Sequence, residues 1–138
     1  MSCDVILCPF TYGIITFMDP RKARIQVREE LLLAKQSRLE GNEGRARVCA
    51  RRAAGTAVKL YLNHKGVLNG SENALQSLDK LRAQSELPPR VKTAVDWLVQ
   101  RVDQSYSLPE EIDLIKEARI ILEFIDRVDP DISAGSWV

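Results

Sequence analysis

The stretch that most constrains the fold of this chain is residues 45–62, where alanine recurs at helical spacing between arginines. At about 100° per residue, one continuous face collects small or apolar side chains, namely Cys49, Ala50, Ala53, Ala57, Leu60 and Tyr61. Because small side chains let another helix approach closely, this face predicts a helix at the centre of a helical bundle. The arginines fall along the borders of the face, where their charged ends reach water.

The rest of the chain carries helical periodicity between recognisable start signals. Asp19 and Pro20 place a capping aspartate before a proline at the first helical position, Ser71 offers a second N-cap, and residues 107–110 have the spacing of a capping box. We therefore predict an all-α fold, an up-and-down bundle of about five helices at about residues 20–40, 44–63, 71–84, 89–103 and 108–128.

Residues 5–18 differ from these helices because they are uncharged, apolar and rich in β-branched and aromatic side chains. Pro9 and Gly13 oppose a helix, so we predict an extended N-terminal arm. The run is too short to span a bilayer and lacks the flanks of a signal peptide, so it predicts no membrane partner. Either the bundle or a second subunit covers its apolar surface, or the segment is partly disordered and has no role. The predicted division is an arm, a bundle domain and a tail, at 1–19, 20–128 and 129–138.

The balance of charge favours no partner class, because the net charge is +1, but the charges are unevenly distributed. Residues 20–52 hold ten basic side chains against four acidic ones, and residues 103–131 hold three against nine. Opposite-signed helices would complement each other in one bundle; the alternative is a basic surface for nucleic acid or nucleotide. The odd cysteine count of three fits a reducing cytoplasm. Cysteine and histidine spacing predicts no metal site, and no motif predicts a cofactor.

Residues 46–62, the Gly/Asn turn that follows them and residues 73–78 resemble the central helix pair of the HEPN family (higher eukaryotes and prokaryotes nucleotide-binding). Residues 31–41 are similar to the family's first helix and its turn, and residues 112–125 to its last helix. The resemblance rests on an alanine-rich helix pattern and on helix order. It implies a bundle of four or five helices, usually a homodimer, often encoded beside a minimal nucleotidyltransferase and acting in toxin–antitoxin systems.

Active HEPN members are metal-independent ribonucleases, and their signature is an arginine followed by a histidine after four to six residues. This chain departs from that signature, because its single histidine, His64, follows Lys59 with four residues between them. The pair also lies at the end of the second predicted helix, whereas the family signature usually lies on a later one. Lysine binds phosphate as a point charge and lacks the bidentate fork of arginine. Lys59 and His64 are therefore weak catalytic candidates, and a solvated helix end is the better interpretation.

Four arginines of the central helix, Arg45, Arg47, Arg51 and Arg52, are candidate ligands of nucleotide or RNA, because arginines along a helix can form charge-assisted bonds to phosphate. The alternative is that they pair with the acidic C-terminal helix. We interpret the chain as a non-catalytic HEPN-like binding or interaction module, dimeric and cytoplasmic. The alternatives are a ribonuclease or nucleotide-binding partner of a nucleotidyltransferase, and a helical scaffold with protein partners only. Trp137 is either a loose end or a surface anchor.

Overall fold

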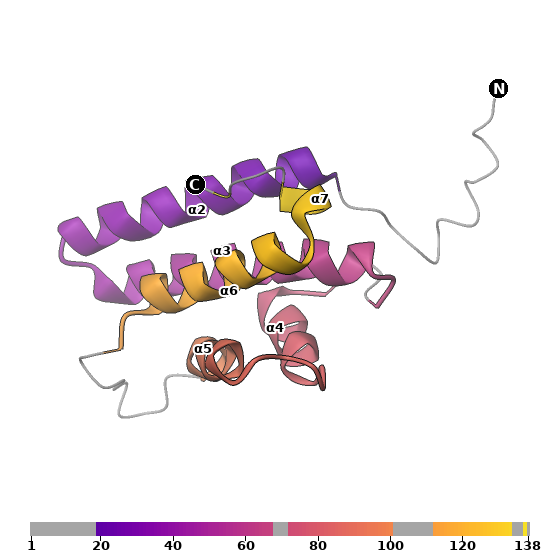
Figure 1. Cartoon of the computed structure of the whole chain (residues 1–138). Helices are drawn as coiled ribbons and strands as arrows, with labels where there is room; N and C mark the ends of the chain where they lie inside the picture. The colour runs from indigo at the N-terminus through magenta and orange to yellow at the C-terminus, as the bar shows by residue number, and fades with distance from the viewer. Residues whose placement is uncertain (1–18, 68–71, 101–111, 134–136, 138) are drawn as a thin grey trace, which may run out of the picture.

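The computed structural model describes residues 19–67, 72–100, 112–133 and 137. In these ranges every regular element is a helix, which confirms the predicted all-α bundle (Figure 1). The helices are α2 (Pro20–Leu39), α3 (Glu43–His64), α4 (Ala74–Arg82), α5 (Pro89–Val99), α6 (Leu114–Val128) and α7 (Pro130–Ser133). The predicted apolar arm lies outside the described residues. None of the described helices is both long and apolar enough to cross a membrane.

Helix α3 lies at the centre of the bundle, as its alanine face predicts. Helices α2, α4 and α6 pack on it, and α5 packs on α4 and α6 (Figure 1). The alanine side chains on the inner face of α3 are buried, and so is Cys49 on the same face. The pKa of the Cys49 thiol is raised mainly by burial and to a smaller extent by the nearby Glu30. Cys49 is therefore a core side chain and is poorly suited to act as a thiolate nucleophile.

Helices α2 and α3 are antiparallel neighbours joined by a short turn. The Asp19 carboxylate caps α2 by accepting a hydrogen bond from the backbone N–H of Arg21, and Pro20 is the first helical residue, as predicted. Gly41 has a φ of 81° in the turn, a conformation that favours glycine. Asn42 then caps α3 through the backbone N–H of Arg45.

Two of the predicted helices begin later than the sequence pattern indicates. Helix α4 begins at Ala74, because Asn73 and Gln76 form a reciprocal capping box with hydrogen bonds of 2.9 Å in each direction. Helix α6 begins at Leu114, so the predicted start at residue 108 is wrong. Its N-cap is Asp113, whose carboxylate accepts hydrogen bonds from the next backbone N–H groups. The predicted capping box at 107–110 lies outside the described residues.

Helix α5 ends at Val99, earlier than the predicted 103, and the C-cap Gln100 has an extended backbone. Arg51 of α3 binds at this end. Its guanidinium donates hydrogen bonds to the carbonyl oxygens of Leu98, at 2.6 Å, and Gln100, at 3.3 Å. These carbonyls lack partners within the helix, so a cation from a neighbouring helix satisfies them.

The C-terminal segment packs back on the bundle. Helix α7 contacts α2, α3 and α6, and Arg24 of α2 donates a hydrogen bond of 2.8 Å to the carbonyl oxygen of Ile132. Ile132 and Trp137 are both 3% exposed and belong to the hydrophobic core. Trp137 is therefore an intramolecular anchor, which the tail's short sequence does not reveal.

Candidate functional site

The weak catalytic candidates Lys59 and His64 lie on different sides of α3. Five residues along an α-helix rotate the side-chain direction by about 140°. Lys59 lines a hollow of about 210 Å³, which is also lined by Arg52 and by residues just before α4. His64 is directed to the end of α6, where its Nδ1 lies 2.7 Å from Oδ2 of Asp129. The structure thus does not bring Lys59 and His64 together.

The four predicted arginines of α3 do not form one cluster. Arg45 and Arg52 are exposed and form no ion pair with a described residue. Arg47 lies 3.7 Å from Glu43, one turn earlier on the same helix. Arg51 holds the end of α5, as described above. Among the described residues, a salt bridge from the basic half of the chain to the acidic C-terminal segment comes from Arg38 of α2, which was not a predicted site residue.

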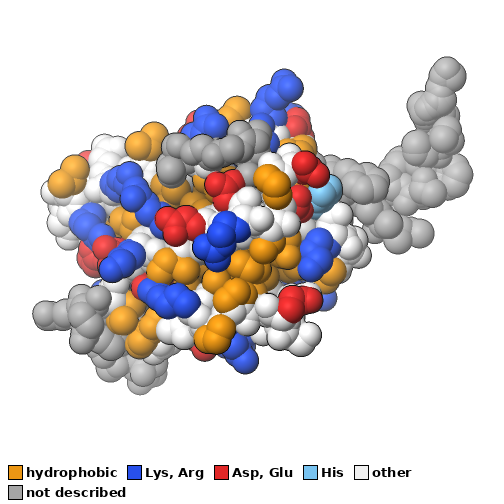
Figure 2. Space-filling view, in the orientation of Figure 1, with side chains coloured by type: hydrophobic (Ala, Val, Ile, Leu, Met, Phe, Trp, Pro, Cys, Tyr) orange, Lys and Arg blue, Asp and Glu red, His pale blue; other side chains and the backbone are white. Residues whose placement is uncertain are grey.

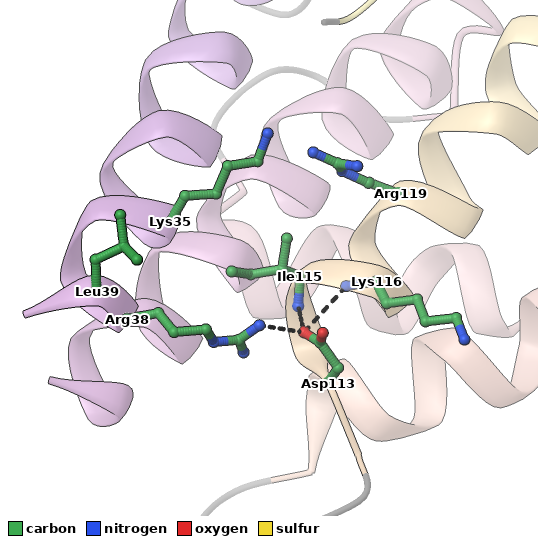
Figure 3. A pocket seen from close by; sticks show the side chains of 7 residues that line it. All are labelled: Lys35, Arg38, Leu39, Asp113, Ile115, Lys116 and Arg119. Carbon is green, nitrogen blue, oxygen red and sulfur yellow. Dashed lines mark hydrogen bonds and ion pairs between the residues drawn. The ribbon is translucent and has the colours of Figure 1, made fainter. Parts of the chain in front are cut away.

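A larger open hollow, about 550 Å³ in volume, lies between α2 and the start of α6 (Figure 3). We call it the basic groove, because four of its seven lining residues are cationic and only one is acidic. They are Lys35, Arg38 and Leu39 from α2, and Asp113, Ile115, Lys116 and Arg119 from α6 and its cap. Both helices pack on α3, which holds them side by side. On the face seen in Figure 2, lysine and arginine side chains lie over α2 and α6, with hydrophobic and acidic side chains among them.

Ion pairs fix one end of the basic groove. Arg38 forms salt bridges to Glu43, at 2.8 Å, and to Asp113, at 2.9 Å. The hydrogen bond to Glu43 raises the pKa of Arg38; burial opposes this rise and the hydrogen bond to Asp113 adds to it. Burial alone would raise the pKa of Asp113, but the bonds from Arg38 and from backbone N–H groups outweigh it and leave that pKa below its ordinary value. Asp113 is thus ionised at neutral pH and paired with Arg38, which it shares with Glu43.

The other cations of the basic groove have no such partner. Lys35, Lys116 and Arg119 form no ion pair with any residue in the described ranges. Lys35 and Arg119 point toward one another from α2 and α6 (Figure 3). Two like charges that face each other across an open hollow repel, and an anion between them removes that repulsion. The groove is therefore suited to bind carboxylate or phosphate groups.

Sequence reasoning missed this groove for a definite reason. Its cations come from both halves of the chain, and the half that contains Lys116 and Arg119 is strongly acidic overall. When the net charge is counted for each segment, the basic half and the acidic half of the chain are therefore predicted to neutralise each other. The available signal was local, namely the pairs 35 and 38 on one helix and 116 and 119 on another, because residues three apart share a helix face.

In the described ranges, no group of three or more His, Cys, Asp and Glu side chains is arranged to hold a metal ion. Comparison of the chain with protein-family models, with curated proteins and with solved structures found no match. The resemblance to the HEPN family therefore stays a prediction from the sequence.

Proposed function

We propose that this chain is a non-catalytic, HEPN-like helical module that binds an anionic partner in the basic groove, and that it acts as a cytoplasmic homodimer. The observation that supports the proposal most directly is the set of three cations, Lys35, Lys116 and Arg119, around one open hollow without an ion-pair partner among the described residues. Binding of an anion gains Coulomb energy there and breaks no existing salt bridge. The described lining residues of the groove include no serine, threonine, cysteine or histidine.

A polyanion-binding experiment tests this proposal. We expect the protein to bind immobilised heparin at low salt, and the double variant Lys35→Glu/Arg119→Glu to elute at clearly lower salt. The matched control is Lys80→Glu/Lys92→Glu, which changes the net charge equally on exposed positions of α4 and α5. If both double variants elute at the same salt concentration, net charge explains the binding and the groove does not.

The second candidate is an HEPN-type ribonuclease or nucleotide-binding partner of a nucleotidyltransferase. The His64–Asp129 contact of 2.7 Å favours it, because a carboxylate that orients an imidazole is a common arrangement for a general base. His64 is, however, half exposed, with no arginine among its described contacts. We expect no cleavage of a single-stranded RNA by the wild-type protein. Cleavage that disappears in His64→Ala would establish the ribonuclease and contradict the proposed non-catalytic role.

The homodimer is tested separately by light scattering on the full chain and on a variant that lacks residues 1–18. A mass of one chain for the full protein would remove the dimer from the proposal. If deletion leaves a dimer intact, the arm is not part of its interface.

A further inference from the structure

Three exposed apolar side chains of α2 continue the basic groove along the helix. Ile25, Leu32 and Leu39 are 46%, 65% and 87% exposed and are spaced seven residues apart. Seven residues return to nearly the same direction on an α-helix, so the three form one stripe, which we call the leucine stripe. Single exposed apolar residues are common, but an aligned set of this size indicates a contact surface.

The leucine stripe borders the basic groove on one side. Leu39 and Lys35 line the groove, and Lys35 also lines a neighbouring hollow with Arg28, Leu31 and Leu32. On the helix, Arg28 and Lys35 are displaced from the stripe toward the groove, whereas Glu29, Gln36 and Glu40 lie on its other border. A ligand that lies in the groove thus meets leucine on one side and basic side chains on the other.

We infer that the groove and the leucine stripe together dock an acidic amphipathic helix of a protein partner; this inference rests on the proposed function. The partner's apolar face covers Leu32 and Leu39, and its carboxylates approach Lys35, Lys116 and Arg119. The stripe is about 21 Å long at 1.5 Å per residue, so the matching segment is a helix of about four turns. Charge-assisted hydrogen bonds from lysine and arginine fix its register.

Charge favours this occupant over an antiparallel pairing of two copies of the same surface. That pairing sets the basic border of one leucine stripe, with Arg28 and Lys35, against the same border of the other copy, and like charges at close range disfavour it. Single-stranded RNA has the negative charge that the groove would bind, but it does not suit the apolar leucine stripe. Its bases stack on aromatic side chains, and the large apolar residues exposed in the described ranges are all aliphatic.

The test uses a fluorescein-labelled probe peptide of about 18 residues, with leucine at helical spacing and glutamate on the opposite face. Its controls are a peptide of the same composition in scrambled order and a single-stranded RNA of similar length. We expect anisotropy titrations to give a dissociation constant of about 10–100 µM for the amphipathic peptide, and at least about tenfold weaker binding for the scrambled one. The double variant Leu32→Gln/Leu39→Gln should bind the amphipathic peptide more weakly than the wild type by a similar factor.

Val48→Gln is the matched control variant, because Val48 is an exposed apolar residue of α3 outside the stripe. Its affinity for the amphipathic peptide should stay within about twofold of the wild-type value. Equal binding of the amphipathic and scrambled peptides would overturn the inference but leave the proposed function standing. The inference would also be overturned, in favour of nucleic acid, if the RNA binds more tightly than the peptide and Leu32→Gln/Leu39→Gln does not change the RNA affinity. Failure of both peptides to bind a protein that still binds heparin through Lys35 and Arg119 would overturn the inference and leave the proposed function standing, whereas loss of heparin binding as well would overturn both.

Discussion

Lys35 of α2 and Arg119 of α6 point toward one another across the basic groove, and neither has an ion-pair partner among the described residues (Figure 3). Like charges that face each other across a hollow repel and lower the stability of the folded protein, and an anionic ligand between them removes this repulsion. Sites that bind ligands commonly carry this kind of local cost, because the groups that serve binding are not arranged for stability. The relationship leads to a prediction about stability that does not need the partner.

Lys35→Gln should raise the free energy of unfolding by a few tenths of a kcal/mol at low salt, because it removes one of the two facing charges. The gain should disappear at about 1 M salt, where screening acts over about 3 Å. Urea unfolding at both salt concentrations measures it. Lys92→Gln, an exposed lysine of α5, is the control and should change stability at neither concentration. A loss of stability in Lys35→Gln would show that Lys35 has a stabilising partner.

Asp113 provides a prediction about pH. Its pKa is lowered in the folded protein despite burial, because Arg38 and backbone N–H groups bind the carboxylate. A lowered folded-state pKa stabilises the protein above the unfolded-state pKa of about 3.9, and this stabilisation is lost as the pH falls through the folded-state pKa. Asn is as good an N-cap as Asp, so Asp113→Asn removes the charge and keeps the cap.

The stability difference between wild type and Asp113→Asn should therefore be constant from pH 7 to about 5 and decline below about pH 4. Because the Asp113 side chain is 43% exposed, solvent screening keeps this difference within about 1 kcal/mol. Asp113→Ala also loses the cap and should cost about 1 kcal/mol more, at every pH. Urea unfolding across this range measures both variants. An Asn variant whose deficit persists unchanged at pH 3 would contradict the electrostatic explanation.

The ion pair between Arg90 and Glu117 should stabilise the contact of α5 with α6. Glu117 is 6% exposed and accepts two hydrogen bonds from the Arg90 guanidinium, at 2.9 and 3.1 Å. The hydrogen bonding to Glu117 raises the pKa of Arg90, although burial opposes this rise. Arg90→Met leaves the buried carboxylate of Glu117 without its partner and should cost about 1–2 kcal/mol, less than for a fully buried pair because the Arg90 side chain is 53% exposed. Arg90→Met/Glu117→Leu should cost less than the single variant. A double-mutant cycle in urea measures the coupling; additive costs would mean that the pair contributes nothing of its own.

The sequence predicted those parts of the fold that depend on local chemistry. The alanine face of α3 predicted the central helix, and Asp19 with Pro20 predicted the start of α2. The predictions failed where two signals competed. The proline and the capping-box spacing at 107–110 favoured an early start for α6, but Asp113 is the cap that the structure uses. At the early end of α5, the Leu98 carbonyl oxygen is bound by Arg51, which is distant in sequence, and no local pattern reveals this contact.

The candidate site was less predictable than the fold, because its residues converge from separate helices. Lys35 and Lys116 are ordinary exposed lysines in the sequence, and only the packing of α2 and α6 on α3 makes them neighbours of one groove. The arginines that stood out in the sequence instead include Arg51, which caps a neighbouring helix. Clustering in sequence was thus a poor guide to clustering in space.

Gly55 gives the sharpest prediction about the packing of the central helix. A Cβ at this position would overlap the backbone and side chain of Ala74, where α4 begins. In a helix interior, Gly→Ala ordinarily gains about 1 kcal/mol from helix propensity. The overlap should reverse that sign, because backbone must move to accept the methyl group, and overpacking of this kind costs about 1–3 kcal/mol.

We therefore expect Gly55→Ala to lower the free energy of unfolding, measured by urea unfolding, by up to about 2 kcal/mol. Gly44→Ala is the matched control on the same helix, because the nearest atom to a Cβ there is Oδ1 of Asn42, at 3.9 Å, an ordinary contact. It should be neutral or stabilising. If Gly55→Ala proves as stable as Gly44→Ala, α4 does not approach α3 as closely as this packing requires, and the small residues of α3 need another explanation.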